Sequence, residues 1–212
     1  MKKFPDLLLM IVVLATLIMF TFSSFNNQAN DNPSKNKIKV SVPSFPDSLF
    51  QSGDLIFREG RGFISTAFRK LSLIDPRYSH AGIIHREKEK IFVYHIIGGE
   101  GNSSGVIRKD FLSIFCSPLQ SNAFGIYRTD QDGHKIDSLA GYYYSKKIGF
   151  DPAFNLASDD KMYCTELLYK ILKKVSGQEN FLPLTTLSGM KYESCDNIYL
   201  SSHSKKIYSF RY

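Results

Sequence analysis

The sequence predicts one folded domain in which helices accompany short antiparallel strands. Apolar residues fall at positions 164, 167, 168, 171, 172 and 175, which is the spacing of one helix face. Upstream, two apolar runs at 79–85 and 90–97 flank a charged turn, which is the pattern of a β-hairpin. A chain of 212 residues suits one such domain together with an export segment.

The N-terminus has the pattern of a targeting segment. Met1-Lys2-Lys3 precedes an apolar run at 7–22, which is shorter than the ~20 residues that usually span a bilayer. We therefore expect residues 1–24 to be a signal peptide or a membrane anchor, and both readings stay open. Residues 25–49 are polar and read as a linker. The chain is expected to be exported to the periplasm or cell envelope of a bacterium.

The remaining residues, 50–212, are expected to form the folded domain. Further strands and helices are predicted from apolar spacing and from turn residues. The expected strands are 55–58, 106–107, 125–128, 197–200 and 207–210, the last two at sheet edges, and the expected helices are 62–73 and 136–147.

Composition limits the partners of the domain. The apolar share of 43% is ample for a core, and the net charge of +7 is spread along the chain. No basic groove with interleaved aromatic residues is visible, so we expect no nucleic acid partner. Attraction to anionic lipid or cell-wall polymer explains the charge more simply. The glycine-rich loop 98–105 lacks the lysine of a phosphate-binding loop, and no cofactor is expected.

Cys164 is the candidate nucleophile. It lies in the first turn of the helix, which Asp159 or Asp160 could cap and Gly177 could end. The positive end of a helix dipole favours a thiolate. The alternative is a small core residue, since free cysteine is among the most buried residue types.

The other two cysteines, Cys116 and Cys195, leave the redox state open. In an oxidising compartment one internal disulfide and one free thiol are possible, and three separate thiols are possible as well.

The hairpin supplies two histidines that could act with the cysteine. His80 would take the thiol proton and His95 would orient His80, provided that the strand register places both on one face. Pairing Ile84 with Phe92 leaves them out of line, and a shift of one residue would align them. A zinc site that includes His85 is disfavoured, because His80 and His85 differ by an odd number and would face opposite sides of a strand. No metal is therefore expected.

Three segments in this order resemble a known family. GDLIF at 53–57, YSHAGI at 78–83 and YCTEL at 163–167 resemble the YiiX-like cysteine hydrolases. These are circularly permuted relatives of the NlpC-type papain-like amidases, and lecithin:retinol acyltransferase is a more distant cousin. The similarity covers about residues 50–175, and the histidine precedes the cysteine as in the permuted order.

The resemblance implies an α+β, circularly permuted papain-like (NlpC-type) fold, with a small antiparallel sheet or half-barrel packed against helices. By motif match it makes Cys164 the nucleophile and His80 the base. Many relatives carry a glutamate at the third position, where this chain has His95, as in the acyltransferase cousin; Glu100 is a second candidate. Tyr163 and Tyr78 are expected to contribute to oxyanion or substrate binding.

The resemblance and the residues together predict an exported thiol hydrolase. It would cleave an amide or ester bond, in a cell-wall peptide or in an acylated lipid or lipoprotein, through an acyl-enzyme on cysteine. Two alternatives stay open, namely an acyltransferase that uses the same residues and an inactive binding module of the same fold. A lowered thiol pKa favours an enzyme, and an ordinary or raised one favours the binding module.

Overall fold

The computed structural model describes residues 46–98 and 105–212. The expected leader 1–24, most of the expected linker 25–49, the second candidate Glu100 and most of the glycine-rich loop lie outside these residues. Within them, no helix has the length and apolar character to cross a membrane. The sheet, helices and site below belong to one compact unit, formed by the described residues other than 187–190.

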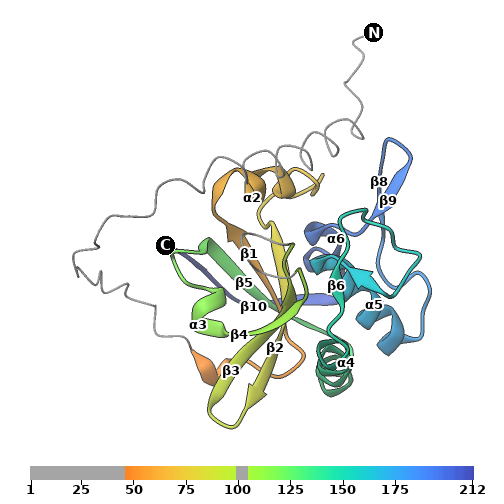
Figure 1. The fold of residues 1–212 in the computed structure, drawn as a ribbon. Coiled ribbons are helices and arrows are strands. Elements are labelled where there is room, and N and C mark those ends of the chain that lie inside the picture. Colours follow the sequence, from red (N-terminus) through yellow and green to blue (C-terminus); the bar gives the residue numbers. More distant parts are fainter. Residues whose placement is uncertain (1–45, 99–104) are drawn as a thin grey trace, which may run out of the picture. The chain divides into compact units, whose positions relative to one another are not determined.

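The predicted mixture of helices and antiparallel strands is confirmed (Figure 1). The strands are β1 (Leu55–Gly60), β2 (His80–Glu87), β3 (Lys90–Ile96), β4 (Ile107–Phe111), β5 (Ser121–Thr129), β6 (Gly149–Phe150), β7 (Lys161–Met162), β8 (Thr185–Leu187), β9 (Met190–Tyr192) and β10 (Ser204–Arg211). The helices are η1 (Asp47–Leu49), α2 (Gly62–Arg69), α3 (Leu112–Phe115), α4 (Gly133–Ser145), α5 (Cys164–Ser176) and α6 (Cys195–Tyr199).

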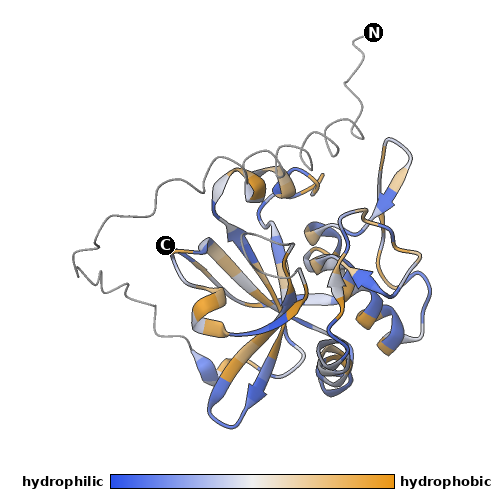
Figure 2. Ribbon diagram, in the orientation of Figure 1, coloured by the Kyte–Doolittle hydropathy of each residue, from blue (hydrophilic) through white to orange (hydrophobic). Residues whose placement is uncertain are grey.

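Six strands form one antiparallel sheet in the order β10-β5-β1-β2-β3-β4. Helices α4, α5 and α6 lie on one side of it and α3 lies on the other (Figure 1). The central strands are buried on both faces, so their sequences read as continuous apolar runs instead of alternating ones. Figure 2 shows these runs as hydrophobic colour along the middle of the sheet.

Two clusters of buried side chains form the core, one on each face of the sheet. Leu55, Phe57 and Ile83 face the cluster that includes the apolar side of α5. Ile56 and Ile84, the neighbours of these residues along β1 and β2, face the cluster that includes α3. Because side chains alternate along a strand, the two clusters take alternate residues of the same strands.

Helix α5 has the predicted apolar face. Leu167, Leu168, Ile171 and Leu172 are fully buried, and burial of each such side chain stabilises the fold by about 1.5–3 kcal/mol. The helix ends as predicted at Gly177, whose φ of 68° lies in the left-handed region that glycine adopts without strain.

The predicted caps of this helix, Asp159 and Asp160, are wrong. Residues Lys161–Met162 form the short strand β7 beside β6, so the chain is extended there and the helix begins at Cys164 with Tyr163 as its N-cap residue. Asp159 instead pairs with Lys170 at 2.8 Å.

Of the two strands predicted near the C-terminus, one is confirmed and the other is wrong. The strand expected at 207–210 is confirmed as part of β10, which forms an edge of the sheet. The strand expected at 197–200 is wrong, because this segment belongs mostly to α6. Cys195, Ile198 and Tyr199 recur at helical spacing and are all buried.

The three cysteines are all free thiols. Cys116 belongs to the core cluster on the α3 face and Cys195 to the cluster on the other face, so the sheet separates them. A disulfide between these two residues is therefore not formed.

Candidate active site

The strand register brings His80 and His95 together. β2 and β3 pair with Ile84 opposite Val93, one residue away from the pairing that would have left the histidines out of line. Continued by one step, this register sets Gly82 opposite His95, and His80 lies two residues further on the same face. His80 Nε2 and His95 Nδ1 are 3.0 Å apart, within hydrogen-bond distance.

Asp110 on β4 extends this pair to a third group, which the sequence analysis missed. His95 Nε2 lies 3.1 Å from Asp110 Oδ2, and Arg108 contacts the same carboxylate at 3.0 Å. In the sequence, the only indication of a third group was one acidic residue in a short strand that follows the hairpin. Only the pairing of β3 with β4 shows that Asp110 reaches His95.

The carboxylate of Asp110 determines the hydrogen positions along this chain of three groups. An ionised carboxylate only accepts, so His95 must donate its Nε2–H to Asp110. The His95 Nδ1 is then an acceptor, and it takes the Nε2–H of His80. His80 is left with an unprotonated Nδ1, which is the form of imidazole that can take a proton from a thiol.

The surroundings keep both imidazoles neutral. Phe115 packs against the two rings, with ring centroids 5.6 Å from His80 and 5.1 Å from His95, and the Arg58 guanidinium lies 4.7 Å from the Phe115 centroid. Burial, helped by the positive charges of Arg58 and Arg108, lowers the pKa of His80 well below its usual value. Burial also lowers the pKa of His95, although Asp110 opposes this shift.

Cys164 is the first residue of α5 and is half-buried. The backbone N–H groups of Cys164, Thr165 and Ala81 are directed at its thiol. Ala81 is the residue after His80 on β2, so the thiol contacts the backbone of the strand that carries the candidate base.

His80 packs against Phe115 on the α3 face of the sheet, whereas α5 packs against the other face, and the described residues show no hydrogen bond between His80 and Cys164. The Cys164 thiol lies near the point where β2 and β3 separate. β2 pairs with β1 from His80 onward, but with β3 only from Ile83 onward. A strand N–H lies in the plane of its sheet, so a thiol that Ala81 contacts is level with the sheet rather than above one face. The positive charge of Arg58 acts to lower the pKa of both Cys164 and His80.

The thiol is neutral in the resting structure. Burial raises the pKa of Cys164 above its ordinary value, while the three N–H groups and the Arg58 charge lower it by less. Helix-start position alone predicted a lowered pKa, and here the desolvation of the thiolate outweighs that effect.

The two tyrosines predicted to contribute to oxyanion or substrate binding, Tyr163 and Tyr78, have different surroundings. Tyr163 is buried beside Cys164, but its hydroxyl accepts the N–H of Glu193 at 2.8 Å. Tyr78 packs in the core between Phe57 and Tyr199, and its hydroxyl lies against Gly125 of β5. This placement gives Tyr78 a structural role, and among the described residues it is not part of the group around Cys164.

Glu166 supports the helix start, as its position about 200° around the helix from Cys164 predicts. It is fully buried, and its Oε2 accepts the N–H of Tyr163 at 3.1 Å. Its Oε1 pairs with Lys170 at 2.9 Å, and burial raises the pKa of Glu166 to about 7.

His85 lies on the other face of β2, as the odd spacing from His80 predicts. Its Nδ1 is 2.9 Å from Asp137 Oδ1 on α4. Among residues 46–98 and 105–212, no three side chains of His, Cys, Asp or Glu converge as metal ligands.

Glu193 is a buried acid behind the helix start. It is 1% exposed, and neither carboxylate oxygen has a hydrogen-bond partner among the described residues. Its backbone carbonyl accepts the Thr165 hydroxyl at 2.7 Å. Burial, with the negative charge of Asp196 nearby, raises the pKa of Glu193 well above its ordinary value.

We expect Glu193→Gln to stabilise the protein at pH 8. The folded state keeps the Glu193 proton while the unfolded chain releases it near its ordinary pKa, so wild-type stability falls as pH rises between the two values. Each pKa unit corresponds to about 1.4 kcal/mol, so the variant should gain at least ~1 kcal/mol at pH 8 and show little gain at pH 4. Thermal unfolding across this pH range measures the difference.

The exposed Glu89→Gln is the matched control, and its stability should follow that of the wild type at every pH. A Glu193→Gln variant that is less stable than the wild type at pH 8 would contradict a neutral Glu193.

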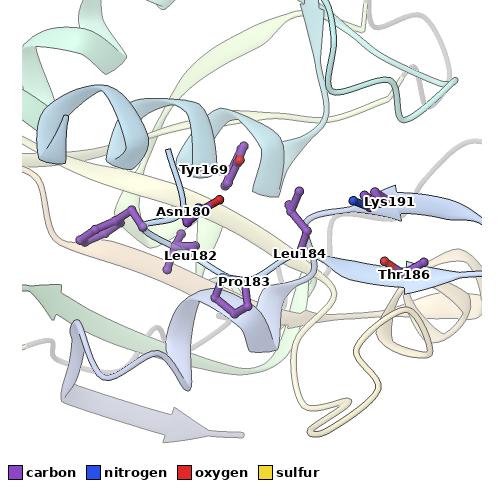
Figure 3. Close-up of a pocket in the computed structure, with 8 residues that line it drawn as sticks. Tyr169, Asn180, Leu182, Pro183, Leu184, Thr186 and Lys191 are labelled. Atoms are coloured by element: carbon purple, nitrogen blue, oxygen red, sulfur yellow. The ribbon is translucent and has the colours of Figure 1, made fainter. Parts of the chain in front are cut away.

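A separate hollow of about 470 Å³ lies beside α5 (Figure 3). It is lined by Tyr169, Asn180, Phe181, Leu182, Pro183, Leu184, Thr186 and Lys191. None of the predicted site residues is among them.

Comparison with known proteins supports the fold. The crystal structure of the metalloprotein YiiX from Escherichia coli O157:H7, described as DUF1105, matches with a TM-score of 0.61 and 17% sequence identity. The match covers 76% of this chain and 98% of the YiiX chain. The YiiX-like resemblance is therefore confirmed at the level of the fold. No protein-family model matches this chain, and no curated protein is similar to it.

Proposed function

We propose, from the fold shared with YiiX and the group at the start of α5, that this protein is a cysteine hydrolase of permuted papain-like fold. It would cleave an amide or ester bond through an acyl-enzyme on Cys164. The observation that carries the proposal is the chain Asp110–His95–His80, with contacts of 3.1 and 3.0 Å, which leaves His80 Nδ1 unprotonated on the strand whose next residue, Ala81, contacts the thiol through its backbone.

The first half-reaction begins with two neutral partners. As Sγ attacks the carbonyl carbon of the substrate, the thiol proton passes to His80 Nδ1. The N–H groups of Cys164 and Ala81 can stabilise the negative oxygen of the tetrahedral intermediate. His80 then gives its proton to the leaving nitrogen or oxygen, which departs as an amine or alcohol and leaves a thioester on Cys164.

Water completes the cycle. His80 takes a proton from the attacking water, the second tetrahedral intermediate collapses, and the sulfur leaves and regains its proton. His95 holds the His80 ring throughout, and Asp110 holds His95. Every proton transfer in this scheme is carried by the side chains named above.

A non-catalytic binding module of the same fold is the second candidate. The raised pKa of the Cys164 thiol favours it, because a resting thiolate is absent. An enzyme that transfers the proton during attack is compatible with the same neutral pair. Formation of a covalent intermediate therefore separates the two candidates better than the pKa does.

The test is acylation of Cys164 by p-nitrophenyl acetate. We expect a burst of p-nitrophenolate and an acetyl group on Cys164, located by peptide mass spectrometry, with both lost in Cys164→Ala and strongly reduced in His80→Ala. Cys116 is fully buried and Cys195 nearly so, which makes them internal controls for non-specific acetylation.

Labelling that is undiminished in both variants would refute the assignment. An acetyl group that stays on Cys164 in water but leaves when an alcohol or amine is added would indicate an acyltransferase. Export of the protein, predicted from residues 1–24, and an envelope peptide or acylated lipid as substrate remain parts of the proposal.

A further inference from the structure

Helix α2 is amphipathic, yet none of its eight residues is buried. Phe63 is 78% exposed. The inner side of the helix is held by Phe68, whose ring lies 5.9 Å from that of Phe154, and by an ion pair of Arg69 with Glu59 at 2.9 Å. A helix of two turns is marginal by itself, so a one-sided apolar helix without core burial suggests a surface that something else covers.

The turn after α2 continues this apolar surface. Leu73 is 56% and Ile74 is 78% exposed, and both lie between α2 and β2. Their backbone is fixed, because the Asp196 carboxylate accepts the N–H of Ile74 at 2.8 Å. Figure 2 shows hydrophobic colour on α2 and on the turn beside it. The exposed side chains are therefore presented by an ordered segment.

Positive charge surrounds these apolar residues. Between residues 60 and 78 the sequence has four basic residues and one acidic residue. Arg69 pairs with Glu59, which also pairs with Arg211, and Arg77 pairs with Asp75 at 2.9 Å. Arg61 and Lys70 lie exposed beside Phe63 and the turn. Large apolar side chains within a basic rim match the interface of a bilayer that contains anionic lipid.

We propose that residues 61–77, the α2 surface, dock the domain on an anionic lipid bilayer. Phe63, Leu73 and Ile74 enter the interface and the basic side chains contact lipid phosphates. The charge of the rim argues for this occupant over an apolar protein partner, which would not need it. The apolar run at 7–22, predicted to direct the chain to a membrane, would bring the domain close to such a surface.

The α2 surface adjoins the candidate active site. Phe68 contacts Phe154, and the Phe154 ring lies 4.6 Å from that of Tyr163, the residue before Cys164. β2 also begins with His80, only a few residues after Ile74. Resting on the proposed function, docking through this surface favours an acylated lipid or lipoprotein as substrate over a cell-wall peptide.

The absence of tryptophan from the sequence allows a clean test with single reporters. The full chain carrying Phe63→Trp is bound to vesicles of phosphatidylcholine and phosphatidylglycerol, some of whose acyl chains are brominated. Tyr142→Trp is the matched control, because Tyr142 is also an exposed aromatic residue (51%) but lies on α4, at the opposite end of the view in Figure 1. Both variants are made in a Cys164→Ala background, so the result does not depend on the reaction.

We expect strong bromine quenching and a blue shift for Trp at position 63, and neither for Trp at position 142. Because residues 1–24 are present in both chains, any tethering by them affects both reporters alike. Arg61→Glu and Lys70→Glu are then added to the Phe63→Trp chain. Each should lower the binding constant for anionic vesicles, obtained from the quenching, by about fivefold. Ile74→Trp repeats the measurement in case position 63 disturbs the helix.

Equal quenching at positions 63 and 142 would overturn the proposal, as would quenching that is the same on neutral and anionic vesicles. Because no substrate is turned over, these outcomes leave the acylation test at Cys164 unaffected. The two proposals can therefore fail separately.

Discussion

Asp110→Asn should lower kcat/KM for p-nitrophenyl ester hydrolysis by about 10²–10⁴-fold while leaving the fold intact. The variant loses the carboxylate that accepts the His95 Nε2–H, and an amide that turns its NH₂ toward His95 places a donor there. A donor at this position reverses the hydrogen positions of both imidazoles. His80 then presents Nδ1–H, which cannot take a proton, to the thiol.

Asp137→Asn is the matched control. Asp137 also contacts a histidine, His85, at 2.9 Å, but this pair lies on the other face of β2, and no hydrogen bond within the described part of the chain joins it to Cys164. We expect near wild-type kcat/KM for this variant. A similar loss in both variants, or full activity of Asp110→Asn, would contradict the role assigned to Asp110.

Gly82→Ala should both destabilise the protein and inactivate it. A Cβ at this position would lie 2.5 Å from Val93 Cγ1, 2.9 Å from the Tyr94 carbonyl oxygen and 3.2 Å from His95 Cβ. The backbone oxygen cannot move aside cheaply, so β3 must shift away from β2. Overpacking of this kind costs about 1–3 kcal/mol. A displacement of His95 by roughly 1 Å would cost on the order of 100-fold in rate.

Gly141→Ala tests the same substitution where space exists. The nearest atom to an added Cβ there is the Tyr94 hydroxyl at 3.8 Å, and Gly141 lies inside α4. Alanine should stabilise this helix by about 0.5–1 kcal/mol. Denaturant unfolding and ester hydrolysis measure both variants, and a neutral Gly82→Ala would show that the approach of β2 to β3 does not position His95.

The strands of the candidate site illustrate how far sequence patterns reach. The apolar runs identified the hairpin of β2 and β3, but the pairing of Ile84 with Val93 instead of Phe92 follows from the whole sheet. A shift of one residue reverses the face of every side chain. The contribution of Asp110 depends on a second such pairing, between β3 and β4, and no local pattern specifies it.

The sequence by itself determined the apolar face of the helix that carries Cys164, the end of this helix at Gly177 and the hairpin with its two histidines, because apolar spacing and glycine conformation are local properties. Only the tertiary structure decided that Asp110 completes the chain of hydrogen bonds, that Tyr78 belongs to the core and that the Cys164 thiol is neutral. Strand register, burial and desolvation arise from residues distant in sequence, so they become defined only when the sheet and helices pack.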